Sequence, residues 1–231
     1  MDALLARQSP HMSAPAPDLV AEANHRIANS LTLLVSMVRM QASSVKKRQA
    51  ALSHDEVRLL LDGIAARINT ISQLHRILSR AGEDGVISLQ PHLREVTDAL
   101  VAALSSQEQS VRVQHRGDDC MVLMRHVQPI VLILCEVFIN AMKYAHPASV
   151  PLVMVVDCSV GGDGRLVLRI SDDGVGLPEE FDMEKSGGLG FRVMRSLTAE
   201  IGGALQIMST HLGLTFRLSL PAGAMSAGKP S

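Results

Sequence analysis

The chain has no tryptophan, one tyrosine and an aromatic content of 2% over its 231 residues. Proteins that bind single-stranded nucleic acid stack bases on aromatic side chains, and proteins that bind duplexes carry a basic surface. Neither feature is present, because 22 basic and 23 acidic residues give a formal net charge of −1. The composition therefore argues against a nucleic-acid partner.

Cysteine and long apolar runs are also scarce. Cys120, Cys135 and Cys158 are an odd number at no metal-ligand spacing within apolar runs, which predicts buried free thiols in a reducing compartment. The longest nearly uncharged run, residues 127–135, ends at Glu136 and is too short to span a bilayer. The first residues lack the basic start and continuous apolar centre of a signal peptide. We expect a cytoplasmic protein with no membrane insertion.

The apolar content of 47% is enough to bury the cores of two modest domains. Residues 1–17 carry three prolines among Ser and Ala, which predicts a flexible leader. Residues 222–231 are small and polar and predict a disordered tail. Between them we expect an α+β chain, with an antiparallel helical hairpin over 18–80 and an α/β sandwich over 81–221.

The predicted hairpin consists of two amphipathic helices. Apolar residues recur at steps of three and four from Leu19 to Val45, and again from Val57 to Leu78. Ser53 and Glu56 form a capping-box pattern where the second helix begins. Two helices with one apolar stripe each leave much of that surface wet, so pairing with a second copy as a four-helix bundle follows as a hypothesis. We therefore expect a homodimer.

In the predicted sandwich, helical and alternating patterns follow one another. A long apolar helix is expected to end at Ala145 and a shorter one at about Ile201. An earlier helix carries Leu93, Val96 and Leu100. Alternating or apolar segments predict the strands, which we expect at 86–89, 110–115, 152–158, 165–171, 204–210 and 214–220.

His25 lies in the first predicted helix, about half a turn from the centre of its apolar stripe and on the same side as Glu22 and Asn29. Its imidazole is therefore expected to face water. From this helix alone, a solvated surface histidine and a functional histidine are equally good interpretations. Asn29 lies one turn beyond His25 and can hydrogen-bond the ring or an incoming group.

The long apolar helix carries one polar stripe, formed by Glu136, Asn140 and Lys143 at i, i+4 and i+7. Such a stripe is either a solvated outer face or a face left for a ligand. Since the other faces of this helix are apolar, we favour a ligand. Carboxylate and amide oxygens suit Mg²⁺, and an ammonium suits a phosphate.

Two glycine-rich stretches follow. Asp172 leaves a strand into Gly174 and Gly176, and Gly188 and Gly190 open a helix. The first stretch is either a tight turn or a base site, in which Asp172 accepts a hydrogen bond from an exocyclic amino group and the glycines let a flat base approach. The second suits phosphates, because free N–H groups and the positive helix end point at the ligand.

In this order, the polar-striped helix and the two glycine stretches resemble the ATP-binding domain of two-component sensor histidine kinases. Residues 25–31, HRIANSL, resemble the phosphoacceptor box of the subgroup that begins His-Arg and has Asn at the fourth position after the His. Residues 71–78, ISQLHRIL, also match, and the resemblance covers 22–221. The sequence departs from the family at Ala28, where a basic residue is usual, and at Leu214, where a Thr is often found.

The resemblance implies a role for each matching residue. His25 would be phosphorylated with help from Asn29 and Glu136, and Mg²⁺ would be held by Asn140 and Glu136. Asp172 would accept a hydrogen bond from the adenine amino group. The remaining matches would line the nucleotide pocket or shape its phosphate lid, and they are Lys143, Tyr144, Gly174, Gly176, Gly188, Gly190 and Thr215. His75 also matches a family position, and we interpret it as structural.

The resemblance thus implies an ATP-dependent, Mg²⁺-dependent histidine kinase that passes phosphate from His25 to an aspartate of a response-regulator receiver domain. No sensor domain is visible, so input is expected from a separate sensor protein, from the leader or from a process outside the sequence. A rival hypothesis is a phosphotransfer or scaffold protein that accepts phosphate at His25 from elsewhere. A serine kinase of the anti-sigma type shares the ATP fold but has no use for the hairpin.

Overall fold

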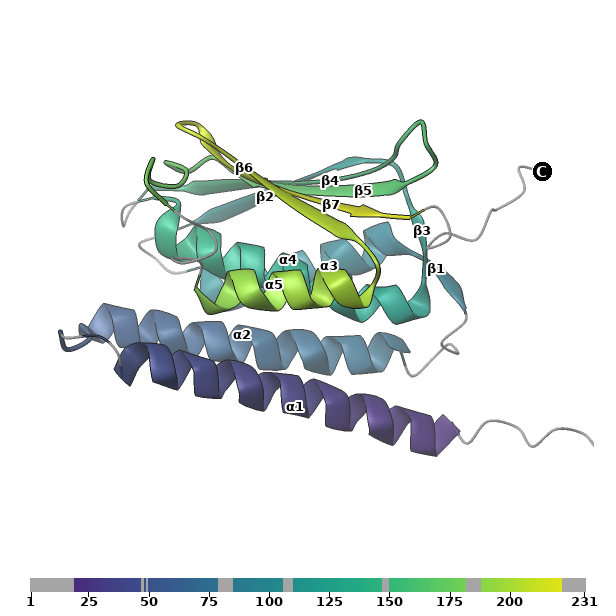
Figure 1. Cartoon of the computed structure of the whole chain (residues 1–231), viewed down its shortest axis with the longest axis horizontal. Helices are drawn as coiled ribbons and strands as arrows, with labels where there is room; N and C mark the ends of the chain where they lie inside the picture. Colours follow the sequence, from purple (N-terminus) through teal and green to yellow (C-terminus); the bar gives the residue numbers. More distant parts are fainter. Residues whose placement is uncertain are drawn as a thin grey trace, which may run out of the picture.

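The helical hairpin precedes the sandwich, as expected. The computed structural model describes residues 19–46, 48, 50–78, 85–105, 110–146, 150–181 and 188–221, with the backbone alone at 19–27, 75–78 and 189. Helix α1 spans Leu19–Lys46 and α2 spans His54–Leu78, and the two run antiparallel (Figure 1). The predicted leader and tail lie outside the described residues.

The turn between α1 and α2 contains the predicted capping box. Ser53 Oγ accepts a hydrogen bond from the Glu56 N–H at 3.1 Å, and Glu56 Oε2 accepts one from the Ser53 N–H at 2.9 Å. Arg48 Nη2 lies 2.7 Å from Glu56 Oε1. Two otherwise unpaired N–H groups at the start of α2 are thereby satisfied, which fixes where the second helix begins.

The sandwich has a mixed five-stranded sheet in the order β2-β4-β5-β7-β6, in which β2 pairs parallel with β4 and every other pair is antiparallel. A separate two-stranded sheet pairs β1 with β3. The strands are β1 Val86–Ser88, β2 Val111–Gly117, β3 Met121–Leu123, β4 Leu152–Val160, β5 Leu166–Asp172, β6 Ala204–Thr210 and β7 Gly213–Leu220. The helices are α3 Leu89–Leu104, α4 Met124–Tyr144 and α5 Leu189–Glu200.

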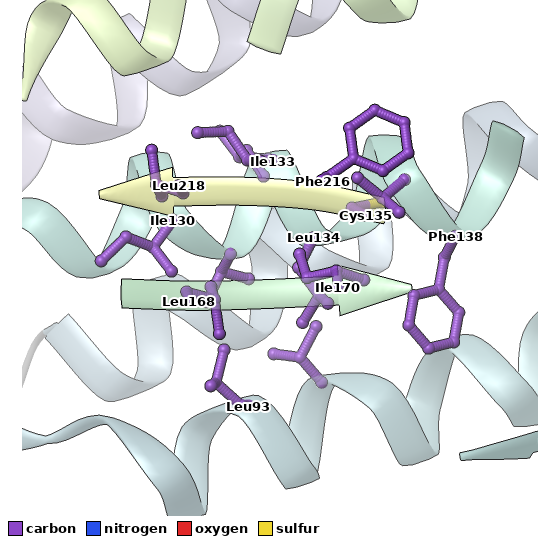
Figure 2. Packing of buried hydrophobic residues seen from close by; sticks show 14 of the residues in the cluster. Leu93, Ile130, Ile133, Leu134, Cys135, Phe138, Leu168, Ile170, Phe216 and Leu218 are labelled. Carbon is purple, nitrogen blue, oxygen red and sulfur yellow. The ribbon is translucent and has the colours of Figure 1, made fainter. Parts of the chain in front are cut away.

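Helix α4 forms the centre of the molecule. Figure 1 shows α3, α4 and α5 against one face of the sheet, with α2 and then α1 beyond them. Figure 2 shows Leu168 of β5 and Leu218 of β7 beside Ile130 of α4. Because α4 has the sheet on one side and helices on the others, it is apolar nearly all round. It is long and apolar enough to cross a bilayer, but most of it is buried in this core.

The apolar stripes of the hairpin are only partly buried in the single chain, in agreement with the sequence expectation. Leu34 and Met37 of α1, like Ile71 and Leu74 of α2, are buried. Other members of the predicted stripes are exposed, namely Leu31 at 54%, Val38 at 40%, Val57 at 40% and Ile68 at 50%. The reason is that the hairpin packs against the helices of the sandwich, so that one side of each stripe is covered and the other faces solvent.

Candidate functional site

A cavity of about 590 Å³ lies where the C-terminal half of α4 meets the end of β5 and the start of α5. This volume is within the range of small-molecule sites. Most of the predicted nucleotide residues line it, and these are Glu136, Asn140, Lys143, Tyr144, Asp172, Gly176, Gly188 and Gly190. The hairpin adds Gln41, Ser44 and Arg67, which sequence reasoning missed.

The sequence suggested that Glu136 forms part of an open polar stripe, but in the structure this residue is buried and paired. Its side chain is only 1% exposed, and both carboxylate oxygens are bound by Arg67 of α2, with Nε–Oε1 at 2.6 Å and Nη2–Oε2 at 2.7 Å. A buried carboxylate needs a cation or several hydrogen bonds. In this structure the hairpin supplies the cation.

One turn further along α4, Asn140 faces the first turn of α5. Its buried Nδ2 has no hydrogen-bond partner among the residues that the structure describes. A Cβ placed on Gly190 would lie 3.1 Å from Asn140 Nδ2 and 3.1 Å from Glu136 Oε2, so a larger residue there would make these side chains shift. The unpaired amide fits a site built for a polar ligand, because buried polar groups are otherwise paired.

Lys143 supplies a cation at the same end of the cavity. Burial lowers the pKa of its ammonium, and the neighbouring Arg67 lowers it further, while Glu136 opposes the change. No group of three or more His, Cys, Asp or Glu side chains is placed to hold a metal ion among the described residues. A divalent cation here would have Glu136 and Asn140 as protein ligands and would need oxygens from a bound ligand to complete its shell.

Asp172 ends β5 at the opposite wall of the cavity. Its Oδ1 accepts hydrogen bonds from the N–H groups of Gly174 at 3.0 Å and Leu214 at 3.2 Å. Burial raises the pKa of this carboxyl, although the two N–H groups act against the rise. One carboxylate oxygen thus fixes the turn and the β7 strand, and the group is positioned to accept a further donor from a ligand.

The glycines after Asp172 lie close to other parts of the chain. A Cβ on Gly174 would lie 2.6 Å from Ala145 Cα, and one on Gly176, whose φ is 72°, would overlap the Thr210 carbonyl. Both glycines therefore let parts of the chain pack against each other. The expectation that they admit a flat base remains a prediction. Gly176 lines the cavity and Gly174 supports its wall from behind.

Thr215 does not belong to the cavity, which corrects the sequence prediction. Its Oγ1 lies 3.0 Å from Ser171 Oγ on the neighbouring strand, whereas the residues on either side of it, Leu214 and Phe216, line the cavity. Successive side chains of a strand point to opposite faces, so Thr215 faces the side of the sheet away from α4.

Tyr144 lies at the rim of the cavity and is 72% exposed.

His25 and Asn29 are predicted catalytic residues that lie far from the cavity. His25 is the farther of the two. It is in α1, sixteen positions before the cavity residue Gln41 of the same helix. At about 1.5 Å per residue this separation is ~24 Å along the axis. Asn29 is exposed one turn after His25. His75 lies in α2, where only the backbone is described.

The burial of Arg67 could have been predicted from its position in the sequence. It follows the buried Ala66 and lies one turn from Ile71, so it is a charged residue on the apolar face of α2. Lys, Glu, Arg and Asp are rarely buried unless paired. An arginine on such a face therefore predicts a buried partner, although it does not identify that partner.

Two family models match the chain. The model described as histidine kinase matches residues 22–104, and the model described as histidine kinase-, DNA gyrase B- and HSP90-like ATPase matches residues 125–224. Together they include both helices of the hairpin and most of the sandwich.

Similar proteins include the blue-light-activated histidine kinase 2 of Erythrobacter litoralis, 26% identical over 218 residues, 93% of this chain and 60% of that one. The sensor histidine kinase PdtaS of Mycolicibacterium smegmatis is 27% identical over 214 residues, 90% of this chain and 40% of that one. The chain thus spans about half the length of these relatives. The solved histidine kinase domain of an E. litoralis blue-light-activated histidine kinase has a TM-score of 0.66 and 25% identity, over 91% of this chain and 98% of that one.

Proposed function

Because the chain belongs to the histidine kinase family, we propose that it is an ATP-dependent protein histidine kinase that phosphorylates itself on His25. The observation that carries the proposal is the convergence of three separate stretches on one cavity. The polar face of α4 with Asn140, the Asp172 turn and the start of α5 at Gly188 all line it. Each stretch has a group suited to a different part of a nucleotide.

The nucleotide roles follow from these groups. The Asp172 carboxylate accepts a hydrogen bond from the adenine amino group, and the N-terminus of α5 at Gly188 and Gly190 binds phosphate oxygens. Lys143 lines the same cavity and supplies an ammonium for the phosphates, and the attraction between the two charges is stronger in a partly buried site than in water. Asn140 and Glu136 would hold Mg²⁺, which would neutralise part of the triphosphate charge.

In the transfer step, a ring nitrogen of His25 attacks the γ-phosphorus. A P–N bond forms as the bond from the γ-phosphorus to the β–γ bridging oxygen breaks, and ADP leaves with the bonding electrons. The phosphorylated ring then loses its remaining N–H proton, for which Glu136 is the family's candidate acceptor. Asn29 orients the ring or the incoming phosphoryl group. His25 lies ~24 Å from the cavity along α1. The step therefore requires either that the hairpin and the sandwich move relative to each other, or that the sandwich of a second copy phosphorylates His25.

The hairpin has an exposed apolar face on which a second copy of the chain could dock. Exposed apolar residues follow one side of the hairpin, namely Leu31, Val35 and Val38 on α1 and Val57, Leu61 and Ile68 on α2. Their spacing of three, four or seven residues is that of a helix-bundle seam. We propose that this stripe forms a homodimeric four-helix bundle. Leu34 belongs to the buried side in the single chain, so its substitution would test hairpin packing and not dimerisation.

The proposed partners complete the reaction sequence. The phosphoryl group passes from His25 to an aspartate of a response-regulator receiver domain. We place the protein in the cytoplasm, which the three free, buried cysteines support. We retain 18–80 as the phosphotransfer hairpin and 81–221 as the catalytic domain, although the first family model also includes α3.

Incubation of the purified chain with γ-labelled ATP and Mg²⁺ tests the proposal. We expect the protein to take up label that is lost in acid and kept in base, as a P–N bond requires. Acid-stable label would indicate a serine kinase. A chain that binds ATP without labelling itself, but accepts phosphate at His25 from a phosphorylated regulator, would establish the phosphotransfer alternative.

A further inference from the structure

The contact between Arg67 and Glu136 joins the hairpin to the nucleotide cavity. The two side chains are 7% and 1% exposed and are 69 residues apart in sequence. The Arg67 guanidinium binds Glu136 through Nε and Nη2 and donates from Nη1 to the Gly63 carbonyl at 3.0 Å. Both oxygens of the carboxylate are therefore occupied by a cation that belongs to α2.

The close packing of α2 on α4 depends on the same region. Gly63 has no side chain, and a Cβ there would lie 3.5 Å from Ile139 Cγ2 and 3.3 Å from Arg67 Nη1. Thr70, one turn beyond Arg67, has its Oγ1 3.6 Å from Cys135 Sγ. The ion pair is thus the polar centre of an interface between hairpin and sandwich (Figure 1).

This docked arrangement cannot transfer phosphate within one chain, because His25 lies ~24 Å along α1 from the cavity. Glu136 is also the carboxylate that the proposed function assigns to Mg²⁺ and to the transfer step. A buried carboxylate is stable with one cation in contact, and a second cation at the same two oxygens would be repelled by the first. Arg67 and a divalent cation therefore compete for Glu136.

We propose that Arg67 is an interdomain latch: it holds the hairpin against the sandwich by occupying Glu136, and entry of a divalent cation with the nucleotide displaces it and releases α2. The inference rests on the proposed function, since it assigns the metal to Glu136 and Asn140. Coupling of this kind is reciprocal. Binding of the metal nucleotide loosens the docked hairpin. Docking of the hairpin in turn raises the apparent Kd for the metal nucleotide by a factor equal to the reciprocal of the undocked fraction.

The variant that tests the latch is Arg67→Met, which keeps most of the apolar stem and removes the charge. Arg58→Met is the matched control, because Arg58 lies on the same helix in an exposed ion pair with Asp62 at 3.7 Å. Calorimetric titrations would measure affinity for ATP with Mg²⁺ and for ATP with a chelator. If the docked form is about nine-tenths of the population, Arg67→Met tightens binding of the magnesium complex roughly tenfold. Metal-free ATP should change less, and Arg58→Met should change neither affinity.

Hydrogen exchange, measured for the variant without nucleotide and for the wild type with and without ATP and Mg²⁺, gives an independent measurement. In Arg67→Met the amides of residues 63–74 should exchange faster than in wild type, and in wild type they should do so when ATP and Mg²⁺ are added together but not with ATP alone. The wild-type experiment holds even if Arg67→Met does not fold.

Three results would overturn the latch. Weaker binding of the magnesium complex in Arg67→Met would make Arg67 a phosphate ligand. A lower melting temperature with unchanged affinities and unchanged exchange would make the pair purely structural. If the amides of the wild type exchange at the same rate with ATP alone and with ATP and Mg²⁺, Arg67 and the cation do not compete for Glu136. A wild-type chain that does not bind ATP at all would instead contradict the proposed function.

Discussion

Substitution of Asp172 by Asn tests the nucleotide site with the least disturbance of the fold. The Asn side chain keeps an Oδ1 that can accept the N–H groups of Gly174 and Leu214, which Asp172 binds at 3.0 and 3.2 Å. What it loses is the charged acceptor for the adenine amino group. A hydrogen bond to a charged group contributes about 1.5–3 kcal/mol. We therefore expect the Kd for ATP and for ADP to rise roughly 10- to 100-fold while the melting temperature stays close to that of wild type.

Two further variants separate this role from others at the same turn. Asp172→Ala leaves two buried N–H groups without an acceptor, at a cost of about 1–3 kcal/mol for each, so it should lose both nucleotide affinity and stability. Asp173→Asn is the matched control, because Asp173 is nearly half exposed and binds His146 at 2.8 Å. It should leave the affinity within about twofold.

The base specificity gives a sharper result. The Asn Nδ2 group donates a hydrogen bond, so Asp172→Asn should face the O6 acceptor of guanine better than the adenine amino group. Titration calorimetry with ATP and GTP would then show the preference for adenine reduced or reversed. Unchanged affinity for ATP in Asp172→Asn, or an unchanged preference between the bases, would refute the assignment of Asp172 to the adenine ring.

Three other predictions follow from the structure. Burial raises the pKa of Asp172, and its ionised form is the stronger acceptor for the amino group. On acidification, the ATP affinity of the wild type should therefore begin to fall at a pH above the ordinary carboxyl pKa of about 4, and the fall should be smaller in Asp172→Asn; an equal fall in both would contradict the reasoning. Leu31→Asp places a charge in the proposed dimer seam and should give monomers in light scattering, whereas Thr32→Asp on the neighbouring exposed position should not; a wild-type chain that is monomeric at roughly 50 µM would reject the dimer. Ser53→Ala removes an N-cap bond at 3.1 Å and should cost about 1 kcal/mol, or roughly 2–4 °C in Tm; the exposed Ser43→Ala is the control, and an equal change in both would contradict the capping role.

The features predicted correctly from the sequence depend on neighbours along the chain. The capping box needs only residues three apart, so it is visible in a single segment. The strand pattern of β4 is of the same kind, since its buried residues alternate from Leu152 to Cys158. Each of these is decided by the local period of the structure.

The features that the sequence did not predict depend on contacts between segments. Arg67 and Glu136 lie 69 positions apart, and no local pattern pairs them. The exposure of Leu31 and Ile68 depends on how the hairpin rests on the sandwich. Thr215 is a different case, because strand alternation between the apolar Leu214 and Phe216 already predicts that it points away from the core.

The measurement that tests the central claim most directly is labelling of His25→Gln with γ-labelled ATP and Mg²⁺, combined with its affinity for ATP. His25 lies in α1, ~24 Å along the helix from the cavity residue Gln41, so the substitution should leave ATP affinity within about 0.5 kcal/mol. The acid-labile label should disappear completely. If His25→Gln still takes up acid-labile phosphate, the acceptor is another histidine, with His75 the first to test, and the assignment of His25 is wrong.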